Sequence, residues 1–307
     1  MIFSKGTKIG YDYIDLQKDI ERLSRLYPFC EILSIGKSVT GRELLCVKVG
    51  NGANSVFYNG AHHGAEWITS GLLIKFLEDY FEKYVCGKKV GEMPTDFLMD
   101  NVSLYVIPMV NPDGVDIAIN GARKYTADFP RLFRQNNNSS DFSKWQANFN
   151  GVDLNHNYDA MWELSRKGEQ AEGIFGPGPT KYSGIEPFSE PETMAIKKFT
   201  EKYDFKLTMS FHSQGQEIYY NFNEKEPIYS FFFARILTLG TPYTVAIPEG
   251  SASYGGYKDW FIDKFGKLGF TIEVGKGENP LPISDLCRIY KETLPILVGG
   301  MKIACLI

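Results

Sequence analysis

The stretch SVFYNGAHHGAEWITSG, residues 55–71, joins a run of β-branched and aromatic residues to the start of an amphipathic segment. The run that ends near Gly60 predicts a buried strand. The segment WITSGLLIKFLEDYFEKY then predicts a helix, because its large apolar residues recur at helical spacing. Those residues are Leu73, Phe76, Leu77, Tyr80, Phe81 and Tyr84. A strand that leads directly into such a helix is typical of an α/β protein.

The same alternation continues along the chain. Strand patterns occur in CEILSIGKSV and ELLCVKVG, which flank TGR like a hairpin, and in SLYVIPMVN, KLTMSFHSQG and GFTIEVG. Helices are predicted at 11–27, 190–203, 227–239, 256–265 and 284–304. Two long polar segments, 120–151 and EGIFGPGPTKYSGIEPFSEPE, are predicted to be irregular loops that border a site.

These patterns predict an α/β fold. We expect a single domain over residues 1–307, with a central, mixed and mostly parallel sheet covered by helices on both faces. In such sheets, catalytic and binding residues gather at the carboxyl ends of the strands.

Composition excludes several classes of protein. The chain has 307 residues, of which 43% are hydrophobic, so it can bury a large core. Its formal net charge of -4 argues against nucleic acid as a partner. Neither an apolar signal segment nor a run of membrane-spanning length is visible in the sequence. We therefore expect a cytoplasmic protein without a membrane partner, and the oligomeric state stays open.

Five cysteines are scattered along the chain without any C-x-x-C spacing. Their odd number and wide separation argue against a disulfide framework or a thiolate zinc site, and fit a reducing compartment. They are Cys30, Cys46, Cys86, Cys287 and Cys305.

Three short motifs carry groups that could share one metal ion. His63 and Glu66 form H-x-x-E at a strand-to-helix junction, although a glutamate there also suits the helix dipole. His212 ends another strand pattern, and two histidines with one glutamate are a known catalytic zinc arrangement. Glu273 ends a very apolar strand pattern, where a carboxylate is costly unless it is paired or acts as a base.

With these motifs in this order, the chain resembles the zinc metallocarboxypeptidases, the carboxypeptidase A-like peptidases, over most of its length. The resemblance implies the zinc carboxypeptidase (phosphorylase/hydrolase-like) fold and one Zn²⁺ held by His63, Glu66 and His212. Glu273 would be the general base and acid. Asp153, in GVDLN, would hold a ligand histidine, although by pattern alone a turn residue is favoured.

The resemblance also implies the chemistry. PRLFRQN matches the family's R-x-x-R motif, so Arg134 would polarise the scissile carbonyl; the alternative is a solvated loop arginine. Zinc would lower the pKa of its bound water, and Glu273 would take the proton as the water attacks the carbonyl. Glu273 would then pass the proton to the leaving amine, which completes amide hydrolysis.

The chain departs from the family in NGVDLNHNYDA, residues 150–160. There the family pattern is N-R-N, which grips the terminal carboxylate of a substrate. Asn155 is kept, but His156 takes the place of the arginine, which is always charged and offers a planar fork. Either His156 still meets a carboxylate weakly as imidazolium, or the site does not recognise a terminal carboxylate.

Two further substrate-binding positions also differ. The family's capping tyrosine falls on Ser251, which leaves Tyr254 or Tyr257 to take that role. The family's specificity position falls on Lys258, which would favour an acidic side chain unless it is a solvated helix lysine.

Within the family, HHGAEWIT, SFHSQGQEIYYNF and ASYGGYKDWFIDKFGKLGFTIEVGKGENPLP look most like the γ-D-glutamyl diamino acid endopeptidases. These enzymes cut the bacterial cell-wall stem peptide between D-glutamate and diaminopimelate, whose side-chain carboxylate Lys258 would meet. The expected partner is therefore a muropeptide in the cytoplasm. The alternatives are a conventional carboxypeptidase that removes C-terminal, possibly acidic residues, and a non-catalytic peptide-binding protein.

Overall fold

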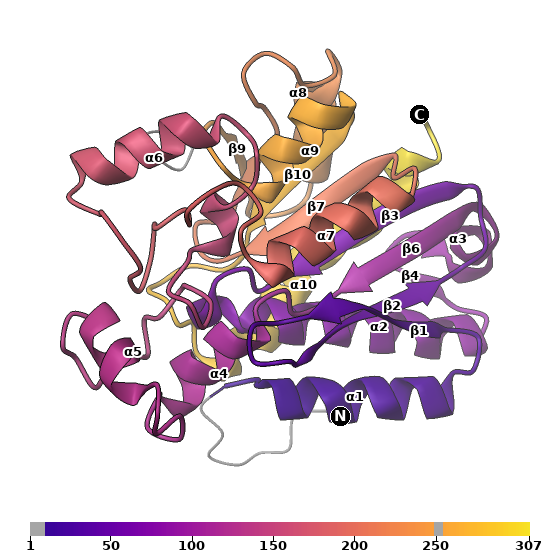
Figure 1. The fold of residues 1–307 in the computed structure, drawn as a ribbon. Helices are drawn as coiled ribbons and strands as arrows, with labels where there is room; N and C mark the ends of the chain where they lie inside the picture. Colours follow the sequence, from indigo (N-terminus) through magenta and orange to yellow (C-terminus); the bar gives the residue numbers. More distant parts are fainter. Residues whose placement is uncertain (1–9, 249–253) are drawn as a thin grey trace.

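The computed structural model describes residues 10–248 and 254–307 (Figure 1). Its centre is an eight-stranded sheet in the order β1-β2-β6-β3-β7-β10-β8-β9. The middle strands β6, β3, β7 and β10 run parallel to one another. Their bounds are β6 (Val102–Ile107), β3 (Asn54–Gly60), β7 (Leu207–His212) and β10 (Leu268–Glu273). The predicted α/β fold with a mixed, mostly parallel sheet is confirmed.

Shorter or antiparallel strands flank this parallel centre. β1 and β2 form the predicted antiparallel hairpin, and β2 pairs antiparallel with β6. On the other side, β8 pairs antiparallel with β10 and parallel with β9. A separate hairpin consists of β4 and β5. The bounds are β1 (Glu31–Lys37), β2 (Glu43–Val49), β4 (Lys89–Val90), β5 (Met93–Pro94), β8 (Glu217–Tyr219) and β9 (Thr244–Ala246).

Helices cover both faces of the sheet (Figure 1). Tyr58 of β3 lies in the core that also contains α1, α2, α8 and α10, and its hydroxyl donates to the Leu297 carbonyl at 2.6 Å. The neighbouring Phe57 faces the other way and packs against Phe199 of α7 and Tyr257 of α9. The helices are α1 (Tyr13–Leu26), α2 (Ile68–Val85), α7 (Pro191–Lys202), α8 (Ser230–Leu237), α9 (Tyr257–Phe265) and α10 (Leu286–Ala304). Burial of both faces explains why the central strands are apolar throughout.

The predicted helices are all present, but four short ones escaped prediction. They are α3 (Thr95–Asn101), α4 (Pro112–Asn120), α5 (Phe129–Gln135) and α6 (Trp162–Ala171). α5 lies inside the segment 120–151, so the prediction that this whole segment is irregular was wrong. In α6 the buried residues are Ser165 and Glu169, which are polar, so no apolar periodicity signals the helix. None of the helices in the described residues is long and apolar enough to span a membrane.

Two buried glutamates at the start of α7 anchor the loop that precedes Asp153. The Asn148 amide donates to Glu190 Oε2 at 2.8 Å and to Glu192 Oε2 at 3.2 Å. Glu192 Oε1 accepts from the Val39 backbone N–H at 3.1 Å. Burial raises the pKa of Glu192 to about 8. This side chain therefore favours its protonated form in the folded protein.

We expect Glu192→Gln to remove a pH dependence of stability. Between about pH 4.5 and pH 8, Glu192 of the folded protein keeps a proton that the unfolded chain has already released. Wild-type stability therefore falls as pH rises through that window. The slope is about 1.4 kcal/mol per pH unit, and glutamine abolishes it because it stays neutral. Urea unfolding across this pH range measures the effect, with the exposed Glu186→Gln as control. Equal slopes in wild type and Glu192→Gln would contradict the assignment.

Candidate active site

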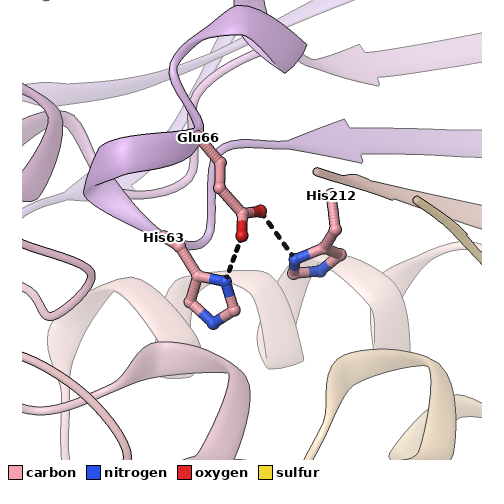
Figure 2. A group of neighbouring side chains, drawn as sticks. All are labelled: His63, Glu66 and His212. Carbon is pink, nitrogen blue, oxygen red and sulfur yellow. Dashed lines mark hydrogen bonds and ion pairs between the residues drawn. The ribbon is translucent and has the colours of Figure 1, made fainter. Parts of the chain in front are cut away.

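The three predicted metal ligands lie together at the carboxyl edge of the sheet (Figure 2). His63 follows β3, Glu66 ends the 3-10 helix η1 (Gly64–Glu66), and His212 is the last residue of β7. One ligand atom from each lies within 4.8 Å of the others. These atoms are close enough together to bind a single ion.

The donor atoms match the preference of zinc. His63 Nδ1 lies 3.0 Å from Glu66 Oε1, and His212 Nδ1 lies 3.1 Å from Glu66 Oε2. Figure 2 shows both rings turned toward the one carboxylate. Two imidazole nitrogens and a carboxylate oxygen form a three-ligand set that leaves a fourth position for water or substrate. The residues present therefore fit a catalytic zinc ion.

Asp153 fixes the orientation of the His63 ring. Its Oδ1 lies 3.0 Å from His63 Nε2, and its Oδ2 accepts from the Lys181 backbone N–H at 2.8 Å. The Asn155 backbone N–H also donates to Oδ1, at 3.2 Å. Because the carboxylate can accept a hydrogen bond from Nε2–H, Nδ1 is the His63 nitrogen that would offer its lone pair to a metal. The structure thus places Asp153 beside His63, the predicted ligand.

The charges of the cluster favour ionised carboxylates. Burial by itself raises the pKa of Glu66, but His63 and His212 outweigh it and lower that pKa to about 2. Burial likewise opposes ionisation of Asp153, yet the interaction with His63 and the Lys181 backbone N–H hold the pKa of Asp153 well below its usual range. For His63, burial lowers the pKa, and the carboxylates of Asp153 and Glu66 more than reverse that shift. Glu66 is therefore in the form that a metal ligand requires.

A tight turn between β3 and α2 holds the first two ligands. A side chain at Gly64 would place its Cβ 2.4 Å from the Gly114 carbonyl oxygen, so only glycine fits there. Ala61 adopts a left-handed conformation with φ of 51°, and its N–H donates to Thr69 Oγ1 at 2.8 Å. Thr69 in turn donates to the Glu66 carbonyl at 2.8 Å. The turn is thus fixed by packing and hydrogen bonds rather than by a flexible loop.

Glu273 lies next to the ligands and borders two pockets. It ends β10 and pairs with His212 of β7 in the parallel register. Burial raises the pKa of Glu273 well above its ordinary value, and the nearby Glu66 carboxylate adds to the shift. A carboxyl group that takes up a proton readily is suited to general acid–base work.

Glu273 belongs to the lining of both pockets. The larger has a volume of about 410 Å³ and is lined by Ala65, Glu66, Lys144, Gln146, Ser213, Gln214, Tyr219, Glu273, Glu278 and Asn279. The smaller has a volume of about 130 Å³ and is lined by His63, Asn155, His156, His212, Tyr219, Pro248, Gly256, Lys258, Asp259, Thr271 and Glu273. A substrate that reaches Glu273 can therefore contact both pockets.

Asn155 and His156 lie in the 3-10 helix η2 (Leu154–His156) and face the smaller pocket. Asn155 Oδ1 accepts from the Tyr257 backbone N–H at 3.1 Å, so its amide NH₂ is the group left for a substrate. His156 Nδ1 lies 3.0 Å from Ser165 Oγ, and burial lowers the pKa of His156. The ring is therefore mostly neutral near pH 7, which disfavours the imidazolium alternative.

Lys258 also faces the smaller pocket, but its charge is already balanced. The side chain is buried, so it is not the solvated helix lysine that the sequence left as an alternative. Its Nζ donates to the Asn221 carbonyl at 2.6 Å and forms an ion pair with Asp259. Because an ammonium group has three N–H donors, one remains for a substrate.

The structure does not bring every predicted residue to these pockets. Arg134 is exposed on the last turn of α5, does not line either pocket, and has no side-chain partner among the described residues. Tyr254 packs against the core between the sheet and α7 and α9. Tyr257 is fully buried there, with its hydroxyl 3.2 Å from Thr200 Oγ1, so it cannot cap a substrate. Ser251 lies outside the described residues.

Several pocket residues carry no sequence signal that would have revealed them. Tyr219 of β8 borders both pockets, and its hydroxyl donates to Glu217 at 2.7 Å. Asn279 donates to the Ser213 carbonyl at 2.6 Å and lies 3.4 Å from Glu66 Oε1. Their positions depend on how β8 and the segment after β10 fold back over the ligands. Asp259 could have been noticed only as the charged neighbour of Lys258.

Comparison with known proteins agrees with this site. The zinc carboxypeptidase family model matches residues 16–296. Gamma-D-glutamyl-L-diamino acid endopeptidase 1 of Lysinibacillus sphaericus is 38% identical over 292 residues, which cover 95% of this chain and 72% of that protein. Bovine carboxypeptidase B is 28% identical over 85% of this chain and 62% of that protein.

Solved structures share the fold. Bovine thrombin-activatable fibrinolysis inhibitor, in complex with tick carboxypeptidase inhibitor, aligns with a TM-score of 0.74 at 22% identity, over 96% of this chain and 97% of that one. Murein-tripeptide amidase MpaA of Escherichia coli O157 aligns with a TM-score of 0.53 at 19% identity, over 89% and 92% of the two chains. The family model, the relative from Lysinibacillus sphaericus and the metal-binding geometry agree: this chain belongs to the zinc carboxypeptidase family of metallopeptidases.

Proposed function

We propose that this metallopeptidase hydrolyses the bond between γ-D-glutamate and diaminopimelate in bacterial cell-wall stem peptides. The observation that carries the proposal is that His156, whose pKa is lowered by burial, lines the smaller pocket, at the position where the family pattern has an arginine for a terminal carboxylate. The 38% identity to a protein named as a γ-D-glutamyl diamino acid endopeptidase supports the same substrate. A muropeptide is thus the proposed partner, and a cytoplasmic location stays a prediction.

The proposed cofactor is one zinc ion at His63, Glu66 and His212. Bound there, zinc supplies a Lewis acid for the scissile carbonyl and for a water molecule. Asp153 holds His63 in the tautomer that such binding needs.

Glu273 is the proposed catalytic base and acid. Its carboxylate accepts a proton from the attacking water, and its raised pKa helps it hold that proton until the amide nitrogen leaves. The same carboxyl group then donates the proton to the leaving amine. Arg134 stays a proposed carbonyl-polarising residue, which would have to reach the pocket from its exposed place on α5.

The two pockets suit the two sides of the cleaved bond. We place the glutamyl side in the larger pocket and the leaving diaminopimelate in the smaller one, where Asn155 and Lys258 lie. The third N–H of the Lys258 ammonium group is the proposed donor to the side-chain carboxylate of diaminopimelate. Conventional carboxypeptidase activity on acidic C-terminal residues is the second candidate, because Asn155 is retained and Lys258 faces the pocket.

Glu273→Gln should lower kcat by about 10²- to 10⁴-fold, because the amide cannot take up the proton of the attacking water. Zinc content, measured by elemental analysis, and substrate affinity, measured by calorimetry, should stay unchanged. The exposed Glu186→Gln, outside both pockets, is the control and should keep its turnover. Full activity in Glu273→Gln would refute its role, and a wild type that binds muropeptide without turnover would support the non-catalytic alternative.

A panel of muropeptide tripeptides and tetrapeptides separates the two candidate activities. With either a free or an amidated terminal carboxylate, we expect the bond after γ-D-glutamate to be cleaved, with kcat/KM values within about tenfold of each other. Mass spectrometry of the products identifies the cleaved bond. Loss of all cleavage on amidation would favour the carboxypeptidase alternative, and turnover of neither form would overturn the proposal.

Lys258 should select diaminopimelate over lysine, which lacks the side-chain carboxylate. We expect kcat/KM to be at least about tenfold lower for a stem peptide with lysine at that position. The double variant Lys258→Met with Asp259→Asn, which avoids a buried unpaired charge, should lose this preference. Competition assays with both peptides measure the ratio. An unchanged preference in the double variant would exclude Lys258 as its source.

A further inference from the structure

Behind His156 lies a line of buried polar groups on α6 that neither the family resemblance nor the proposed mechanism uses. His156 Nδ1 lies 3.0 Å from Ser165 Oγ, and Ser165 Oγ lies 3.3 Å from Glu169 Oε1. Ser165 and Glu169 are fully buried. The line therefore ends at a carboxylate shielded from solvent.

The donors that contact the other oxygen of Glu169 determine which way the hydrogen bonds run between His156, Ser165 and Glu169. Glu169 Oε2 accepts from the Ser183 backbone N–H at 3.1 Å and from the Ser183 hydroxyl at 3.0 Å. Burial raises the pKa of Glu169 above its ordinary value, and the contacts with Ser183, Arg166 and Ser165 only oppose that rise. The ionised form is the one that fits the geometry, because both carboxylate oxygens face hydrogen-bond donors. An ionised carboxylate only accepts hydrogen bonds, so Ser165 must donate its one proton to Oε1.

The proton on the His156 ring follows from this direction. Because the Ser165 proton points at Glu169, Ser165 Oγ can offer His156 only a lone pair. His156 Nδ1 must then carry the single proton of the neutral ring, and Nε2 is bare. No described residue donates to Nε2, and the ring lines the smaller pocket. The pocket therefore presents a hydrogen-bond acceptor at this position.

We propose that Ser165 and Glu169 are positioning residues that lock His156 in its Nδ1–H tautomer, so that Nε2 accepts a hydrogen bond from a substrate N–H. A carboxylate oxygen has no proton to give and would face a lone pair, whereas an ammonium or amide nitrogen of the leaving residue fits. The tautomer follows from these contacts when Glu169 is ionised and the His156 ring is neutral. Its consequence for substrate choice rests on the proposed function.

The tautomer can be measured without any substrate. The chain has only four histidines, so long-range ¹H–¹⁵N correlation spectra of the zinc-loaded protein resolve each ring, and His156→Gln identifies the His156 signals by their loss. At neutral pH we expect a protonated Nδ1 and a bare Nε2. A proton on Nε2, or on both nitrogens, would overturn the proposal whatever the enzyme cleaves.

Glu169→Gln should reverse the direction of the hydrogen bonds between residue 169, Ser165 and His156. The Ser183 backbone N–H needs an acceptor, so the glutamine carbonyl oxygen takes the Oε2 place and its NH₂ group faces Ser165. Ser165 then donates to Nδ1, and the ring proton moves to Nε2. We expect the spectrum to show this switch, and the ratio of kcat/KM for free-acid over amidated substrate to rise about tenfold.

Two more variants keep the test decisive. Glu163→Gln changes an exposed glutamate of the same helix and should leave both the spectrum and the ratio unchanged. Ser165→Ala removes the hydroxyl that connects His156 to Glu169, so we expect a mixture of the two tautomers of His156. This variant also provides a test if Glu169→Gln folds poorly. A retained Nδ1–H tautomer in either Ser165→Ala or Glu169→Gln would refute the positioning role.

Discussion

The Glu66 carboxylate lies between two imidazole nitrogens, 3.0 Å from His63 and 3.1 Å from His212, and the architecture around it keeps that arrangement. β3 and β7 are adjacent parallel strands, so their carboxyl ends bring the two histidines to the same edge. The close approach at Gly64 sets the turn that carries Glu66. Asp153 then orients His63, and its loop is anchored through Asn148 to the start of α7. The segments that carry Glu66, Asp153 and His212 are far apart in the sequence, yet all three are held in place around His63.

Hydrogen-bond direction, rather than net charge, distinguishes the smaller pocket. Among the described residues, the one lysine in its lining is paired with Asp259, and the histidine at the position of the family's arginine is mostly neutral near pH 7. Charge alone therefore gives this pocket little preference for an anion. The pocket offers two hydrogen-bond donors, which are the free N–H of Lys258 and the amide NH₂ of Asn155. The unprotonated nitrogen proposed for His156 is an acceptor, so each group binds only a partner of the opposite kind. A buried polar site of this kind discriminates strongly, because a mismatched ligand leaves a desolvated donor or acceptor unsatisfied.

The candidate metal site could be predicted because H-x-x-E after one apolar strand pattern and His212 at the end of another match the motifs of the family that the chain resembles. Strand ends in a parallel sheet share an edge, so order in the sequence translates into proximity. The helix α6 could not be found in the same way, because its buried residues Ser165 and Glu169 are polar and leave no apolar period. α5 was missed because it is short and buries only Leu132. Arg134 matched a motif, yet its side chain is exposed, since a motif states residue type and spacing but not the direction of a side chain.

The sequence by itself indicated the α/β class and the order of the central elements along the chain, because periodicity is a local property. Its resemblance to the family pointed to His63, Glu66, His212 and Glu273 as the candidate site. Only the tertiary structure decided that Lys258 is neutralised by Asp259, that Tyr257 belongs to the core, and that His156 rests on Ser165 and Glu169. These features depend on desolvation and on which donor meets which acceptor across elements distant in sequence. Neither property can be read from residue type, because the same side chain is charged, neutral, donor or acceptor according to the groups that fold around it.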